Sequence, residues 1–311
     1  MADKVDAMIV GAPKSGTTSL LRYLGAHPWV HVPADVEFTA FDPRISRDRR
    51  ARELAGFLQE STRCLRLVKH AGAYHRPDEI DGVLQHNPAC RLILILRDPV
   101  DRAHSAFRMA SLRGETRSTF AEAIDQALTL ETEGNTEDYR VRRYLTGGRY
   151  ADWCGKLFSR CDRDQIAVLV LEAFQRDPAS HYRGLCEWLR LDSGFLPDFS
   201  ARENVGGEAR SVLVARGLER LRSERSPARR TAKRMLPSGL YRRLSKAIRS
   251  ANRRTWESGP IDSSTESRLR DYFAKPNARL ADLLGTESEW VSVNHSHSQA
   301  SVDDPQPTSK R

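Results

Sequence analysis

The stretch IVGAPKSGTTSLLRYLGAHP, residues 9–28, decides the fold class. A short apolar run ends in a glycine turn, and a segment with leucines on one side then begins at Thr17 and stops near Gly25 and Pro28. A strand, a turn and a helix N-terminus together present backbone N–H groups and the positive end of a helix dipole to an anion. The stretch therefore predicts a strand–loop–helix unit with an anion site in its loop.

Apolar runs alternate with helical segments along the first two thirds of the chain. The runs LRLVKH (65–70), RLILILRDP (91–99) and QIAVLVLEAF (165–174) are typical of strands, and three segments between or after them are typical of helices: 77–86, 99–113 and 177–191. The run that begins at residue 91 is apolar enough to be buried on both faces of a parallel sheet. This alternation predicts an α/β, three-layer P-loop-like fold with a central, largely parallel sheet.

The last third of the chain differs in composition. Residues 210–254 carry 15 Lys and Arg residues against two glutamates, and they dominate the net charge of +9. We expect a helical, Arg-rich lid or insert there, then an amphipathic helix at 267–285 that is broken or kinked near Pro276. Residues 1–290 should form a single domain, and the polar tail 291–311 should be disordered.

Composition also limits the class of protein. The chain is 39% hydrophobic and 29% charged, which is typical of a globular protein. It has no run of about 20 apolar residues that would predict a membrane span, and its N-terminus lacks a signal-peptide profile. The five cysteines are scattered without CxxC spacing, which favours free thiols over a disulfide framework or a zinc site. We expect a cytoplasmic protein without a bound metal.

The first loop differs from a nucleoside-triphosphate loop in the position of its lysine. The pattern GxxxxGK[ST] is half met, because Gly11 and Gly16 have the required spacing but Thr17 occupies the lysine position, and the cation is Lys14. The apolar run LILIL ends in Arg97, where an acid would help to hold Mg²⁺. Both features disfavour a P-loop kinase or NTPase, which remains an alternative.

Two stretches resemble motifs of the sulfotransferases that use 3′-phosphoadenosine 5′-phosphosulfate (PAPS). Residues 9–28 resemble their 5′-phosphosulfate loop, and LILILRDPVDRAHSAF, residues 92–107, resembles their 3′-phosphate motif. EFTAFD (37–42) and GGRYADWCGKLF (147–158) are similar to the bacterial and heparan-sulfate-type branch. The resemblance implies a metal-independent enzyme that moves a sulfuryl group from PAPS to a hydroxyl or amine and releases adenosine 3′,5′-bisphosphate (PAP).

The resemblance also implies roles for individual residues. Lys14 would contact the 5′-phosphate and the bridging oxygen, where leaving-group charge develops. Arg97 and Ser105 would bind the 3′-phosphate, because a guanidinium fork and a hydroxyl suit a dianion. The donors that would line the phosphosulfate cradle are adjacent in the chain: Ser15, Gly16, Thr17 and Thr18.

Attack by an acceptor requires a base that takes the acceptor's proton. Glu37 matches the glutamate that serves as base in the heparan-sulfate-type branch, and Lys69 matches a lysine that assists transfer across the family. His70 is the alternative base, because the cytosolic branch uses a histidine near this point. That histidine lies two residues after the lysine, however, where this chain has Ala71. We therefore rank Glu37 above His70.

These motifs leave the acceptor open. A carbohydrate, a glycolipid, a small metabolite and a peptide tyrosine all fit, and the branch favours a glycan or a small hydroxylated metabolite. The segment 210–254 could cover the acceptor cleft and favour an anionic or lipid-associated acceptor. It lacks interleaved aromatic residues, which disfavours the further alternative of a basic nucleic-acid-binding protein.

Overall fold

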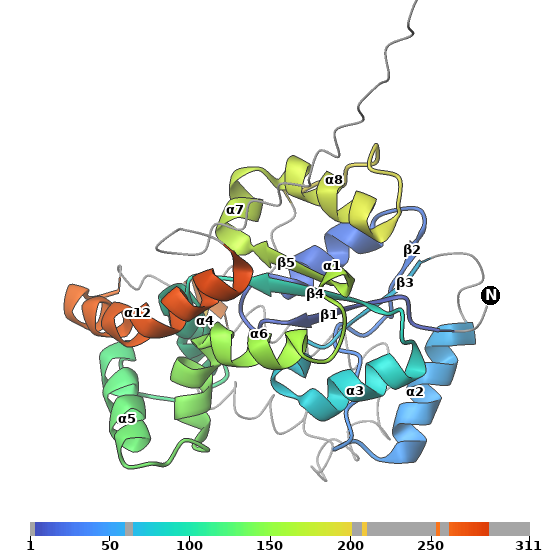
Figure 1. Ribbon diagram of the computed structural model, residues 1–311. Coiled ribbons are helices and arrows are strands. Elements are labelled where there is room, and N and C mark those ends of the chain that lie inside the picture. Colours follow the sequence, from blue (N-terminus) through green and yellow to red (C-terminus); the bar gives the residue numbers. More distant parts are fainter. Residues whose placement is uncertain (1–3, 60–64, 201–206, 210–252, 256–260, 286–311) are drawn as a thin grey trace, which may run out of the picture.

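The computed structural model describes residues 4–59, 65–200, 207–209, 253–255 and 261–285 (Figure 1). Five parallel strands form the central sheet in the order β2-β3-β1-β4-β5. Their bounds are β1 Ala7–Gly11, β2 Val30–His31, β3 Leu65–Lys69, β4 Arg91–Leu96 and β5 Ile166–Val170. The predicted parallel sheet is confirmed, and the carboxyl ends of β1, β3 and β4 meet at one edge, where ligands of open α/β sheets bind.

Helices cover both faces of this sheet (Figure 1). One face packs against α2 (Arg47–Gln59), α3 (Pro77–His86) and α6 (Tyr150–Phe158). The other packs against α1 (Thr17–Gly25), α7 (Leu171–Arg176) and α8 (Pro178–Leu189). Alternate side chains of β4 enter opposite cores, with Leu92 and Leu94 on one face and Ile93 and Ile95 on the other. The three-layer prediction is therefore confirmed.

A third apolar core lies beside the sheet, and it contains one of two helices that the sequence patterns did not predict. α4 (Pro99–Leu112) packs there against α5 (Phe120–Thr132), the π-helical turn η2 (Val141–Leu145) and α12 (Ser263–Leu284). α5 begins with a capping box in which Thr119 and Glu122 bond to each other's backbone N–H groups. The spacing T-x-x-E is a sequence signal for this helix start. α2 is the other unpredicted helix, and only Phe57 of that helix is buried.

One sequence prediction of an element's bounds was wrong, and of the break or kink expected near Pro276 the break is absent. The strand expected over 165–174 ends at Val170, and Leu171 begins α7. Leu171 and Phe174 lie three residues apart, so their apolar side chains suit one helix face as well as they suit the end of a buried strand. Pro276 does not break α12, which continues to Leu284. The fully buried Phe273 and Leu280 anchor the helix on both sides of the proline.

Most of the Arg-rich segment 210–254 and all of the tail 291–311 lie outside the described residues. The last two arginines of that segment belong to β7 (Arg253–Thr255), which pairs antiparallel with β6 (Gly207–Ala209) rather than forming a helix. In the part of the chain that the structure describes, no helix has the length and apolar character needed to cross a membrane. The described cysteines are free thiols: Cys90, Cys154, Cys161 and Cys186.

Candidate active site

The loop between β1 and α1 forms a cradle with two residues in the left-handed backbone region. Lys14 has φ +76° and Gly16 has φ +87°. Gly16 is the N-cap of α1, and no side chain of the described residues caps this helix. The first turn also contains no acidic residue. Because uncapped N–H groups at a helix N-terminus favour an anion, the predicted anion site has the required backbone.

We expect Gly16→Ala to destabilise the protein. An added Cβ would lie 2.8 Å from Leu171 Cδ1, and an alanine would have to adopt a positive φ. Left-handed strain alone costs about 1–3 kcal/mol in the free energy of unfolding. Urea unfolding measures the loss. The matched control is Gly155→Ala in α6, where a Cβ meets nothing within 4 Å and should stabilise by up to about 1 kcal/mol. Equal stabilities of the two variants would contradict the expected strain.

A cavity of about 560 Å³ opens beside the cradle at the carboxyl edge of the sheet. Seven of the predicted site residues line it: Lys14, Gly16, Thr17, Thr18, Glu37, Arg97 and Ser105. Ser15 and Lys69 do not line it. Ser15 is fully buried beneath the cradle beside the Tyr150 hydroxyl, and Lys69 lies behind Glu37 with 1% of its side chain exposed. The structure thus brings together residues that are distant in the chain.

Lys14 is a half-buried ammonium without an ion-pair partner among the described residues. Its Nζ contacts Met109 Sδ at 3.7 Å. Burial lowers the pKa of Lys14 from its ordinary 10.5 to about 8. Four guanidiniums add to this pKa shift: Arg113, Arg97, Arg102 and Arg108. A lysine held among arginines rather than carboxylates has a strong preference for an anionic ligand.

Arg97 lies directly after the last residue of β4. Two contacts of its own and the cap of the helix that follows hold it there. The Tyr150 hydroxyl donates to the Arg97 carbonyl oxygen at 2.9 Å, which explains why the stretch 147–158 packs beside the site. Arg97 Nη2 lies 3.4 Å from Asp101 Oδ2, and Asp98 caps α4 through the Val100 N–H at 2.8 Å. Arg97 Nε has no hydrogen-bond partner among the described residues. Nε is buried, but Arg97 lines the cavity and its side chain is 26% exposed, so an anion in the cavity can reach the guanidinium.

Aromatic residues form a second part of the cavity wall that sequence reasoning missed. The Tyr23 ring stacks with Phe174 at 6.1 Å between centroids and contacts Phe199 edge-on at 5.1 Å. These rings come from α1, α7 and the segment after α8, so no local pattern in the chain relates them. Arg113, at the end of α4, is a further missed cation of the lining. Cations with flat apolar walls suit a ligand that combines phosphates and a planar ring.

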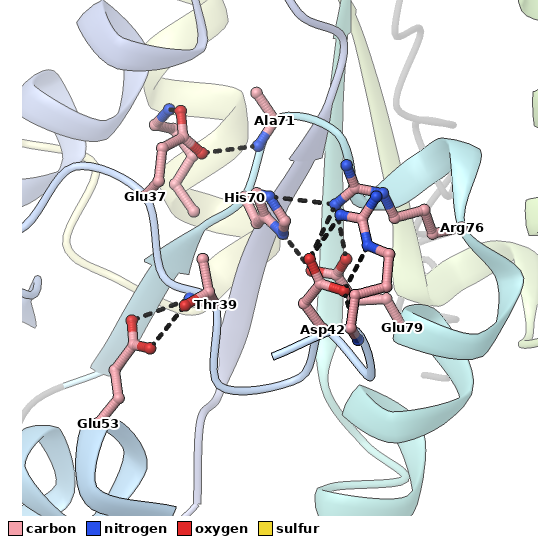
Figure 2. A network of polar contacts seen from close by, with 10 residues as sticks. Glu37, Thr39, Asp42, Glu53, His70, Ala71, Arg76 and Glu79 are labelled. Carbon is pink, nitrogen blue, oxygen red and sulfur yellow. Dashed lines mark hydrogen bonds and ion pairs between the residues drawn. The ribbon is translucent and has the colours of Figure 1, made fainter. Parts of the chain in front are cut away.

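Glu37 lies at the cavity with both carboxylate oxygens occupied. Oε1 pairs with Lys69 Nζ, and Oε2 accepts from the Ala71 N–H at 3.0 Å (Figure 2). The Glu37 side chain is 48% exposed, so a ligand can reach it. The Phe38 N–H donates to the Lys69 carbonyl at 2.7 Å, which fixes the Glu37 segment against the end of β3.

His70 points away from the cavity. Figure 2 shows its ring directed at Glu79 and Arg76, on the other side of the turn from Glu37. Nδ1 bonds to Glu79 Oε1, and Nε2 lies 3.2 Å from Arg76 Nη1. This placement favours Glu37 over His70 as the base.

Asp42, His70 and Glu79 hold atoms within 4.8 Å of one another, a spacing that a metal ion could use. Guanidiniums already pair with both carboxylates, because Arg44 Nη2 lies 2.6 Å from Asp42 Oδ2 and Arg76 Nη1 lies 3.2 Å from Glu79 Oε2. The hydrogen bond from Arg44 lowers the pKa of Asp42 to about 2. These contacts make the cluster an ion-pair network rather than a set of free ligands.

The model of the sulfotransferase domain family matches residues 4–204, which are more than half of the chain. The chain belongs to the sulfotransferase family. This assignment confirms the resemblance seen in the sequence and makes the protein an enzyme of the transferase class. It gives no support to the kinase alternative.

Two nematode relatives are each named bifunctional heparan sulfate N-deacetylase/N-sulfotransferase 1. The Caenorhabditis briggsae protein is 24% identical over 197 residues, and the Caenorhabditis elegans protein is 23% identical over 192 residues. Each alignment covers 60% of this chain but 22% of the relative, so this chain spans about a fifth of the length of those proteins.

Among solved structures, the sulfotransferase from Alicyclobacillus acidocaldarius has a TM-score of 0.64 and is 21% identical. The superposition covers 93% of this chain and 98% of that one. This likeness confirms the fold class.

Proposed function

We propose that this sulfotransferase moves a sulfuryl group from PAPS to a hydroxyl or amine by in-line transfer without a metal. The observation that carries the proposal is the Lys14 ammonium, half-buried among arginines at the uncapped N-terminus of α1. A sulfuryl group bears less negative charge than a terminal phosphate. One ammonium, hydroxyls and backbone N–H groups can therefore stabilise its transfer without a divalent cation.

The cavity walls divide the binding of the nucleotide among three sets of residues. In this proposal Lys14, Thr17 and Thr18 bind the 5′-phosphosulfate, and Arg97 with Ser105 binds the 3′-phosphate. The rings of Tyr23, Phe174 and Phe199 then offer apolar surface to the adenine. The product PAP keeps both phosphates, so it should bind to the same residues.

Proton removal falls to Glu37 in this proposal. Its exposed carboxylate takes the proton from the attacking group, and Lys69 and the Ala71 N–H hold it in place. In-line transfer requires that the base and the cation that stabilises the leaving group face the same cavity. Both Glu37 and Lys14 line this cavity.

The acceptor in this proposal is a carbohydrate, a glycolipid or a small metabolite. The names of the two nematode relatives favour a carbohydrate amine or hydroxyl. The charge of residues 210–254 favours an anionic or lipid-associated acceptor over a neutral one. Free cysteines agree with a cytoplasmic location, which belongs to the proposal.

Two measurements test the proposed function. PAP alone should protect the protein from heating more than ATP with Mg²⁺ does, because Arg97 and Ser105 offer donors to a 3′-phosphate that ATP lacks. Radiolabelled PAPS should transfer its label to at least one member of a panel of amino-sugar oligosaccharides, glycolipids and hydroxylated metabolites. Better protection by ATP with Mg²⁺, or no label transfer to any acceptor, would contradict the proposal.

Arg97→Met should remove discrimination for the 3′-phosphate. Calorimetry should show PAP affinity lower by about 10- to 100-fold, since a hydrogen bond to a charged group contributes about 1.5–3 kcal/mol. Affinity for adenosine 5′-phosphate should change little. Arg268→Met is the control, because Arg268 pairs with Asp125 between α12 and α5 and lies outside the cavity lining. Equal losses for both nucleotides in Arg97→Met would contradict a 3′-phosphate role.

A further inference from the structure

We propose that His70 is a positioning residue that acts through Glu37. In this arrangement His70 fixes the turn at residues 69–71, which carries both groups that hold the Glu37 carboxylate. The inference rests on the proposed function, in which Glu37 takes the proton of the acceptor.

Hydrogen bonds of both the backbone and the side chain of His70 hold the turn. The His70 N–H donates to the Ile9 carbonyl on β1 at 3.0 Å, and the His70 carbonyl accepts from the Ala73 N–H at 3.0 Å. The ring bonds to Glu79 through Nδ1 and to Arg76 through Nε2. The side chains of His70 and Glu79 are 12% and 0% exposed. Few conformations of the turn are compatible with all these contacts.

Both nitrogens of the ring have partners in the network. A guanidinium only donates hydrogen bonds, so Nε2 accepts from Arg76 and Nδ1–H donates to the Glu79 carboxylate. The charged groups around the ring are paired, Arg44 and Arg76 with Asp42 and Glu79. These contacts fix the position of the His70 ring, and with it the position of the turn.

The network also joins the turn to the segment that carries Glu37. Arg76 Nη1 lies 3.4 Å from Asp42 Oδ2, and Asp42 lies five residues after Glu37 (Figure 2). Lys69 and Ala71, the chain neighbours of His70, contact the two oxygens of Glu37. Displacement of His70 would shift the Lys69 ammonium and the Ala71 N–H, which together orient the Glu37 carboxylate. Small displacements at a reacting centre reduce rates strongly.

The first test compares the rate constant of transfer with nucleotide binding. In His70→Ala, kcat for transfer from radiolabelled PAPS should fall by about 10- to 100-fold, while the Kd for PAP stays within about twofold. The acceptor is the one found with the panel above, and release of labelled sulfate to water is the second assay. His70→Asn retains an N–H near the position of Nδ1 and should recover most of the rate. An unchanged kcat in His70→Ala would overturn the proposal.

A double-mutant cycle with Glu37→Gln separates positioning from a merely structural role. If His70 acts through Glu37, adding His70→Ala to Glu37→Gln should lower kcat by less than about threefold. The same 10- to 100-fold loss in both backgrounds would overturn the proposal. Should His70→Ala fail to fold, Glu79→Gln replaces it in the cycle with the same expected result. A wild-type protein that transfers nothing overturns the proposed function, whereas wild-type transfer with additive losses overturns only the role of His70.

Discussion

Lys14→Ala should lower kcat for sulfuryl transfer by about 10²- to 10³-fold. This is the loss expected when one donor to developing transition-state charge is removed from a buried site. The Kd for PAP should rise as well, because the ammonium also faces the 5′-phosphate. Radiolabelled PAPS measures the rate, and calorimetry measures PAP binding. Activity within a few-fold of the wild type would contradict a role for Lys14 at the bond that breaks.

The lowered pKa of Lys14 adds a pH dependence to PAP binding. The free ammonium loses its proton near pH 8, and a bound phosphate raises this pKa because it stabilises the charged form. Above about pH 7, where the phosphates of PAP are largely dianionic, PAP affinity should therefore fall as the pH rises through 8, by up to about tenfold per pH unit. Lys14→Arg stays charged throughout this range and should give a flat profile. A wild-type profile that is also flat would contradict the lowered pKa.

Because Lys14 has a positive φ, two substitutions can separate the effect of its charge on activity from the effect of its backbone strain on stability. A lysine at φ +76° is strained by about 1–2 kcal/mol, and glycine at this position is not. Lys14→Gly should thus unfold at higher urea concentration than Lys14→Ala, although both variants lack the ammonium and should lose activity to the same extent. Strain at a residue of the cavity lining is consistent with selection for function rather than for stability.

Glu37→Gln should lower kcat by about 10²- to 10⁴-fold, the usual contribution of general base catalysis. Glutamine retains an oxygen that can accept from Lys69 or the Ala71 N–H, so the turn at 69–71 should keep its place and the Kd for PAP should hardly change. The control is Asp35→Asn, an exposed acid two residues earlier in the same segment, which should keep full activity. Retained transfer in Glu37→Gln would remove this residue from the base role.

The placement of the proposed phosphate-binding residues in one cavity was predictable because local geometry produces it. One strand–loop–helix unit contains Lys14, Gly16, Thr17 and Thr18. The contacts that form this unit are local in the chain, so the local backbone determines where these donors point. Arg97 and Ser105 are eight residues apart across a strand end and the helix α4, so their shared exposure to the cavity also follows from local structure. Resemblance to a known family supplied the roles that spacing alone did not.

The remainder of the site depends on contacts between segments that are distant in the chain. Tyr23 and Phe199 meet because α1 and the segment after α8 pack on the same face of the sheet, and the apolar residues of α1 would look the same in any buried helix. The sequence did not indicate Arg113 as a residue of the cavity lining either, since an arginine at a helix end is common on any surface.

The sequence by itself determined the parallel α/β fold, the anion cradle and the displaced lysine, because backbone periodicity and a glycine turn are local properties. Only the tertiary structure decided the environment of each charge. It placed Lys14 half-buried among arginines, it directed Glu37 toward the cavity with Lys69 behind it, and it turned His70 into an ion-pair network on the other side of the same turn. Burial and charge pairing arise from segments brought together in space, and these determine which residue can bind an anion and which can accept a proton.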